Sequence, residues 1–156
     1  MGLKPILPKR RPIPDARKMQ RVIENALTAT AKAIKVDFGV TTRTWSKRPD
    51  FKIESPNWYT RLIYTDNKIY GYVSGGTRPH VIRAKNASRL AFPGNYAAKT
   101  AVGVIGSTAG GSSGPTRFAQ EVHHPGFPGR KFPQVIGKKW RREWPRNLKR
   151  ALASEM

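Results

Sequence analysis

Three histidines, His80, His123 and His124, are the side chains here best suited to general acid–base or metal chemistry. Zinc takes four protein ligands, or three and a water, and favours histidine and cysteine. The chain has no cysteine and few carboxylates near these histidines. The sequence therefore predicts no metal site and no cofactor. We expect His80 and His124 instead to hydrogen-bond turn backbone or to bridge to a neighbouring chain.

Other constellations that support catalysis are equally weak. Glu54, Asp66 and Glu121 lie in or beside predicted strands, where ion pairing with the many basic residues explains them better than catalysis. The glycine-rich stretch 103–115 lacks the Gly-Lys-Ser/Thr end of a phosphate-binding loop. No Gly-x-Ser-x-Gly elbow or metalloprotease helix occurs. We therefore predict no catalytic residues and no enzymatic activity.

Positive charge is the dominant chemical feature of the chain. Its 156 residues include 30 Lys and Arg but only 9 Asp and Glu, for a net charge of +21. Such an excess is far beyond what solubility requires, and it favours a polyanion or an acidic protein surface as partner. More than half of it lies in residues 1–18 (+5) and 130–150 (+8).

Residues 1–14 are predicted to form an extended basic arm, because four prolines exclude a helix. The arm is either a solvated tail or a segment that orders on a neighbouring subunit or on DNA, and the sequence leaves both open. The candidate contacts with DNA or an acidic partner are Lys9, Arg10 and Arg11 in the arm, with Lys138, Lys139, Arg142, Arg146, Lys149 and Arg150 near the C-terminus.

The C-terminal cations belong to a predicted amphipathic helix. At 100° per residue they lie opposite one apolar arc, formed by Ile136, Trp140, Trp144, Leu148, Ala151 and Leu152. The tryptophans on that arc favour core packing over base stacking. The basic arc is either the solvated side or a contact surface for phosphates or acidic subunits. We expect Pro145 to break the helix, giving one segment from Pro133 to Glu143 and another from Pro145.

The chain also has a predicted N-terminal helix of about six turns, capped by Asp15, apolar on one face from Met19 to Phe38, and stopped by Gly39. Beyond it, β-branched and aromatic residues predict an antiparallel sheet. Its expected strands are 40–45, 51–54, 58–65, 80–83, 89–92 and 118–123, with 69–73 a strand or a short helix.

These elements define an α+β fold. A long N-terminal amphipathic helix and a C-terminal basic helix are expected to pack on an antiparallel β-sheet, with an extended N-terminal arm. After the arm, residues 15–156 are predicted to form one domain, with a flexible loop at 103–115. No apolar run approaches the length of a membrane span.

One block of the sequence is distinctive. Gly76-Thr77-Arg78-Pro79-His80-Val81-Ile82-Arg83-Ala84-Lys85-Asn86 is followed by Leu90-Ala91-Phe92 and then by Val122-His123-His124-Pro125-Gly126. This succession resembles the tail-completion, or neck, family of lambdoid-type long-tailed bacteriophages. The resemblance covers about residues 68–133.

The resemblance implies a structural virion protein without catalytic activity. It would form a homo-oligomeric ring, expected to be a hexamer, at the phage head–tail junction. Its partners would be connector or stopper proteins and tail terminator or tail-tube proteins, with non-specific contact to lumenal DNA and none to membrane. Assembly would take place in the host cytoplasm. The implied subunit or inter-ring contacts are Thr77, Arg78, His80, Arg83, Lys85, Asn86, His124 and Arg130.

The charge alone supports an alternative function. A free basic nucleic-acid-binding protein of ribosomal or nucleoid type explains +21 without any resemblance.

Overall fold

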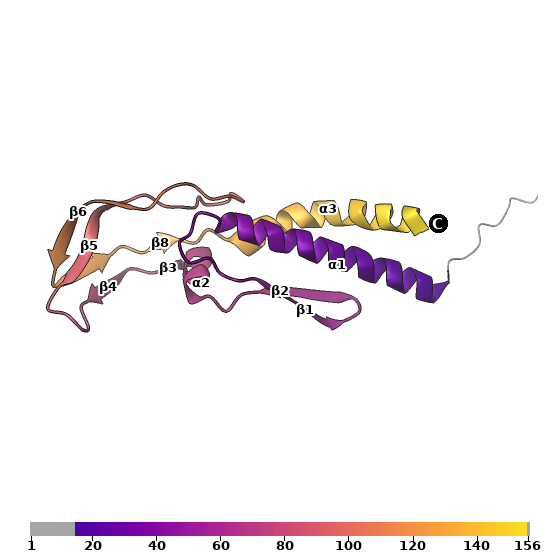
Figure 1. The fold of residues 1–156 in the computed structure, drawn as a ribbon, viewed down its shortest axis with the longest axis horizontal. Coiled ribbons are helices and arrows are strands. Elements are labelled where there is room, and N and C mark those ends of the chain that lie inside the picture. Colours follow the sequence, from indigo (N-terminus) through magenta and orange to yellow (C-terminus); the bar gives the residue numbers. More distant parts are fainter. Residues whose placement is uncertain (1–14, 156) are drawn as a thin grey trace, which may run out of the picture.

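Two long helices, α1 (Ala16–Thr41) and α3 (Phe132–Glu155), lie side by side in one half of an elongated molecule (Figure 1). The computed structural model describes residues 15–155, so the predicted arm 1–14, with Lys9, Arg10 and Arg11, lies outside the described residues. The helices combine with short antiparallel strands, which confirms the predicted α+β class.

Helix α1 begins where the sequence predicts. The Asp15 carboxylate accepts a hydrogen bond from the Arg17 N–H at 3.2 Å and caps the first turn. Val22, Ala26 and Phe38 of the predicted apolar face are buried. This face holds α1 against the rest of the molecule.

The end of α1 differs from the prediction. The helix continues past Gly39, so the predicted stop there and the predicted strand at 40–45 are both wrong. The Thr41 hydroxyl donates to the Phe38 carbonyl at 2.6 Å, and the Thr42 hydroxyl donates to the Gly39 carbonyl at 3.2 Å. These threonines satisfy the last helical carbonyls, so the β-branched run ends the helix and does not form a strand.

A hairpin of β1 (Lys52–Asn57) and β2 (Thr60–Tyr64) packs on α1, on the side away from α3 (Figure 1). Ile53 lies opposite Ile63 in the antiparallel register. The Arg61 side chain is only 6% exposed, and its guanidinium reaches Glu24 of α1 at 3.5 Å. This half of the molecule therefore has three layers: α3, α1 and the hairpin.

The core lies where the three helices meet. Helix α2 (Lys68–Gly75) is capped by Asn67, whose side chain accepts from the Tyr70 N–H at 2.9 Å, so the segment left open at 69–73 is helical. The Tyr70 ring stacks on Phe132 at 5.5 Å between centroids and meets Phe51 edge-on at 5.0 Å. This aromatic cluster joins the start of α3 to the end of α1.

The other half of the molecule is a long two-stranded excursion, residues 76–128, which we call the ribbon. Its outgoing strands are β3 (Gly76–Thr77), β4 (His80–Arg83) and β5 (Leu90–Tyr96), and its returning strands are β6 (Ser112–Ala119), β7 (Glu121–His124) and β8 (Phe127–Pro128). They pair as β3–β8, β4–β7 and β5–β6, all antiparallel. In the described residues, the predicted sheet is thus four separate two-stranded ladders, including the β1–β2 hairpin.

The ribbon doubles back toward the helices (Figure 1). Its bend lies at residues 84–89 on the outgoing side, opposite the break at Gln120. The far loop, 97–111, then returns to the end of α1: the Lys99 ammonium donates to the Thr44 carbonyl at 3.2 Å, and Ile105 packs against the core. Residues 112–115 belong to β6, so the predicted loop 103–115 is too long at its C-terminal end.

Helix α3 is continuous through Pro145, contrary to the predicted break. Contacts with α1 hold it on both sides of the proline. The Trp140 Nε1–H donates to the Asp37 carboxylate at 2.7 Å, and the Asn147 amide donates to the Thr30 hydroxyl at 3.5 Å. Packing on α1 therefore keeps the two halves in line despite the lost backbone hydrogen bond.

Candidate functional site: the ribbon and two faces of the helical half

The turns at the base of the ribbon depend on two glycines of the distinctive block. Gly76 has φ +85° and Gly126 has φ +76°, values that disfavour any residue with a Cβ. A Cβ on Gly76 would lie 2.5 Å from the Gly129 nitrogen, and one on Gly126 would collide with the Thr77 carbonyl oxygen. The block therefore lets the two strands approach closely where the ribbon leaves the core.

His80 and His124 face each other across the ribbon. They are register partners in β4 and β7, and their rings stack with centroids 5.0 Å apart. His80 Nδ1 lies 2.8 Å from the Arg78 carbonyl oxygen, and the Gly126 N–H donates to His124 Nδ1 at 2.9 Å. Both imidazoles therefore satisfy turn backbone in this conformation.

A cluster of charged and polar side chains, Arg83, Glu121 and His123, lies at the far end of the β4–β7 ladder. Arg83 Nε donates to Glu121 at 3.0 Å, and His123 Nε2 lies 3.0 Å from the other oxygen of that carboxylate. The hydrogen bond from Arg83, and then that from His123, hold the pKa of Glu121 below its usual value. Among the described side chains, which end at residue 154, no three His, Cys, Asp or Glu gather closely enough to hold a metal ion.

The remaining predicted contacts are spread along the ribbon. Thr77 is half-buried in β3, whereas Arg78 is exposed next to it. Lys85 and Asn86 are exposed at the bend. Arg130 lies at the base, where its backbone N–H donates to the Val73 carbonyl at 3.0 Å. These residues therefore mark the two ends of the first leg of the ribbon and do not form one compact site.

The ribbon exposes apolar side chains that the sequence analysis did not single out. Val81, Ile82, Tyr96 and Phe118 are between 38% and 72% exposed. Each ladder has only two strands among the described residues, so its outer edges have no strand partner there. The apolar residues could be read as strand formers from the sequence, but their exposure depends on whether another element packs on the faces of the ribbon.

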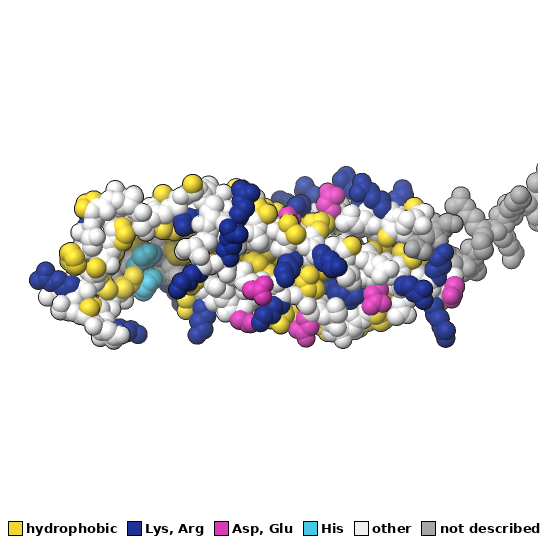
Figure 2. Space-filling view, viewed as in Figure 1, with side chains coloured by type: hydrophobic (Ala, Val, Ile, Leu, Met, Phe, Trp, Pro, Cys, Tyr) yellow, Lys and Arg dark blue, Asp and Glu magenta, His cyan; other side chains and the backbone are white. Residues whose placement is uncertain are grey.

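Cations of α3 are exposed along the upper edge of the molecule (Figure 2). Lys138, Arg142 and Lys149 fall within one narrow arc of the helix, and we call them the cation row. No ion pair links any of the three to another described residue. The row therefore keeps its charge available to a partner.

The other predicted contacts on α3 differ in their surroundings. Lys139 pairs with Asp37 at 2.7 Å, and Arg146 pairs with Glu143 at 3.4 Å. Arg150 is exposed beside the end of the cation row. Among the described residues, two of the predicted cations of α3 thus pair within the molecule, Lys139 and Arg146, and the other four have no ion pair.

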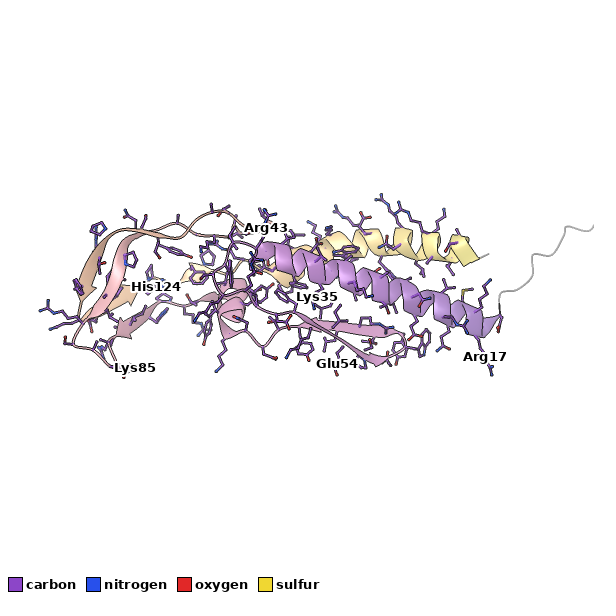
Figure 3. All side chains as sticks on the ribbon, in the orientation of Figure 1. Arg17, Lys35, Arg43, Glu54, Lys85 and His124 are labelled. Atoms are coloured by element: carbon purple, nitrogen blue, oxygen red, sulfur yellow. The ribbon has the colours of Figure 1, made fainter. Side chains whose placement is uncertain are left out.

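A second surface lies on the opposite side of the helical half. The hairpin exposes Trp58, Tyr59, Leu62 and Tyr64, between 36% and 60%, beside an exposed Glu54. The register pairs Glu54 with Leu62, and Figure 3 shows Glu54 on the side of the hairpin away from α1. We call these five residues the hairpin face. The signal in the sequence is the apolar run Leu62-Ile63-Tyr64, which places apolar side chains on both faces of β2.

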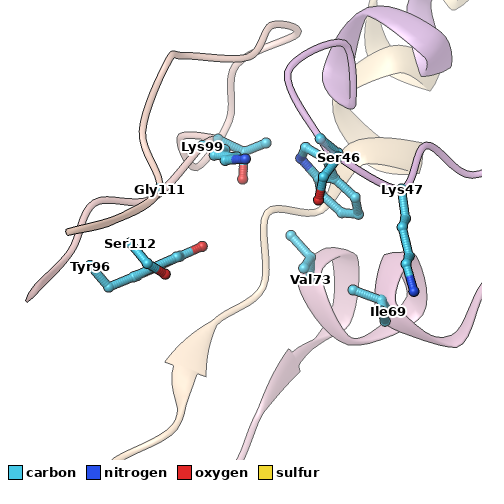
Figure 4. Close-up of a pocket in the computed structure, with 10 residues that line it drawn as sticks. Ser46, Lys47, Ile69, Val73, Tyr96, Lys99, Gly111 and Ser112 are labelled. Carbon is cyan, nitrogen blue, oxygen red and sulfur yellow. The ribbon is translucent and has the colours of Figure 1, made fainter. Parts of the chain in front are cut away.

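A hollow of about 300 Å³ marks the seam where the ribbon returns to the helical half (Figure 4). Ile69 and Val73 of α2 line one side, and Tyr96 and Ser112 of the ribbon line the other. Segments far apart in the sequence contribute to it, which is why no local motif indicates it.

Comparisons with known proteins add no family assignment. No protein-family model matches the chain, and no curated protein or solved structure matches it. None of the helices in the described part of the chain is long and apolar enough to cross a membrane.

Proposed function

We propose that this protein is a structural subunit of the phage head–tail junction, a neck ring that joins the connector to the tail and surrounds the passing genome. The observation that carries the proposal is the ribbon. It extends from the core as two-stranded ladders whose edges no other described strand pairs, with exposed Val81, Ile82, Tyr96 and Phe118. Its base is formed by the block that resembles the neck family.

Such a ribbon favours assembly for a physical reason. A two-stranded ladder is marginally stable alone, and its open edges are templates for pairing with another chain. Burying a large apolar side chain contributes about 1.5–3 kcal/mol. Contact with neighbouring copies would cover both the edges and the apolar residues. A contact between two different surfaces of identical subunits generates a ring when the rotation between neighbouring subunits closes.

The charge of +21 suits the proposed position. A ring that encircles DNA and stacks on other virion proteins meets phosphates or acidic surfaces, either of which relieves repulsion among clustered cations. The expected neighbours are connector or stopper proteins on one side and tail terminator or tail-tube proteins on the other. From the resemblance to the neck family, we expect the ring to be a hexamer.

Electron microscopy of the assembled particle tests this function. An antibody to the protein should label the head–tail junction, and removing its gene should leave filled heads and finished tails that do not join. Intact, infectious particles without the protein would contradict the proposal.

The cation row supports a second candidate, a free nucleic-acid-binding protein. Lys138, Arg142 and Lys149 would each contact phosphates, and each contact would steepen the fall of affinity with salt. This candidate predicts tight binding of a monomer to DNA or RNA. The neck proposal predicts an assembly whose affinity for free nucleic acid is weak and non-specific.

A further inference from the structure

The helical half of the molecule presents two unlike surfaces on opposite sides. Helix α1 lies between α3 and the hairpin (Figure 1), so the cation row and the hairpin face point away from each other. A protomer with two different faces on opposite sides can pack head to tail with identical copies.

Their charges are complementary. Residues 132–155 of α3 carry seven basic and two acidic residues, a net +5. Residues 50–66, which contain the hairpin, carry three acidic and two basic residues, a net −1 in a chain of +21. One of those basic residues, Arg61, is buried against α1. The other, Lys52, lies opposite Tyr64 and pairs with Asp66 at 2.9 Å, which leaves Asp50 and Glu54 as the acidic residues without an ion pair in the described hairpin region.

Their chemistry is complementary as well. Glu54 has no ion pair with another described residue, and neither do the three members of the cation row. Tyr59 and Trp58 expose aromatic rings at the tip of the hairpin, 5.3 Å apart. Guanidinium groups bind carboxylates through two parallel hydrogen bonds and also stack on aromatic rings. An arginine such as Arg142 thus finds both of its preferred partners on the hairpin face.

The two faces also match in length. The cation row runs from Lys138 to Lys149, about 16 Å at the helical rise per residue. The hairpin face runs from Tyr59 to Tyr64, about 17 Å at the rise per residue of a strand. A helix can therefore lie along the hairpin with contacts over the full length of both faces.

We propose that the cation row of one copy binds the hairpin face of the next copy, forming a head-to-tail contact between subunits. This inference rests on the proposed function, because it assigns the surfaces that build the ring. It assigns the row to a neighbouring subunit and not to DNA.

A charge swap tests the contact in the full chain. Arg142→Glu alone and Glu54→Arg alone should each weaken self-association about ten-fold in sedimentation velocity, because each places like charges together. The double variant restores an opposite-charge pair in reversed order and should recover association to within about three-fold of the wild type. Lys35→Glu, at an exposed position of α1 that belongs to neither face, makes the same change in net charge as Arg142→Glu and should have little effect.

Disulfide trapping gives an independent readout, since the chain has no cysteine. Mixing Leu62→Cys protein with Lys138→Cys protein should give covalent dimers on oxidation, and neither variant alone should give them in comparable yield. Trapping confined to the mixture supports a head-to-tail contact of these two faces.

The outcomes separate this inference from the proposed function. If Arg142→Glu forms rings as well as the wild type does, the proposed contact is wrong but the ring stands. The same holds if self-association of the double variant is weakened by the product of the two single effects. Loss of duplex DNA binding in Arg142→Glu with unchanged self-association would assign the row to nucleic acid and overturn the contact. A wild-type protein that stays monomeric at low salt in sedimentation velocity would overturn both.

Discussion

At the scale of single residues, the distinctive block serves backbone geometry. Gly126 adopts φ +76° and donates its N–H to His124, whose ring stacks on His80. The turn requires a glycine at position 126 and a hydrogen-bond acceptor at position 124, which explains why these residue types occur there. The block could therefore be recognised from the sequence, whereas the stacking of the two histidines depends on the β4–β7 register.

Gly126→Ala should destabilise the protein by at least about 2 kcal/mol, because alanine is strained at positive φ and its Cβ would collide with the Thr77 carbonyl. Gly137→Ala is the matched control: it lies in α3 with open space around it, and should stabilise by about 0.5–1 kcal/mol. Urea unfolding measures both changes. Equal effects of the two substitutions would contradict the described turn.

Because the Tyr70 phenol is buried, we expect the free energy of unfolding to fall at alkaline pH. Burial raises its pKa above the usual value, so the folded state holds the proton more tightly than the unfolded state. The stability that this contributes is complete below about pH 10, the unfolded pKa of tyrosine, and is lost as the pH rises further. Tyr70→Phe should remove this loss. The free energy of unfolding of both proteins at about pH 9 and about pH 11 checks it, and parallel declines would refute the assignment.

At the scale of elements, the helices were the most predictable part of the chain. The Asp15 cap and the apolar face of α1 follow from local chemistry. The strand predicted at 40–45 is wrong because the Thr41 and Thr42 hydroxyls bond the last carbonyls of α1, a local effect. The break predicted at Pro145 is wrong because contacts with α1 override the local preference. The fold-back of the ribbon has no local signal, because it depends on Ile105 reaching a core built from distant segments.

The α1–α3 contact depends on the Asp37 carboxylate. It accepts hydrogen bonds from Lys139 and from Trp140, both at 2.7 Å, and the Asp37 side chain is only 14% exposed. Asp37→Ala should therefore cost about 2 kcal/mol in thermal or urea unfolding. Glu143→Ala, which removes an exposed pair with Arg146, should cost less than about 0.5 kcal/mol. The reverse order would show that the described helix contact is wrong.

Pro145 offers a second test of α3. Because the helix is continuous, Pro145→Ala restores a backbone hydrogen bond to the Arg141 carbonyl and should raise stability by about 1–3 kcal/mol. Circular dichroism followed through denaturation measures the gain. A decrease in stability would indicate that the proline is needed to end one helix and start another.

At the scale of the whole molecule, the structure separates a ribbon, whose edges no other described strand pairs, from a helical half with the cation row on one side of α1 and the hairpin face on the other (Figure 1). The sequence indicated both the excess of charge and its concentration at the termini. It could not indicate that α3 and the hairpin lie on opposite sides of α1, because that depends on how three elements stack. The proposed ring follows from this arrangement together with the ribbon.

Native mass spectrometry of the purified full-length protein, with electron microscopy of the same sample, tests the ring most directly. The account predicts one closed oligomer, expected to be a hexamer, with a central opening and a population that falls as salt rises. A monomer at every concentration and salt would contradict it, above all if that monomer bound nucleic acid tightly with a steep salt dependence.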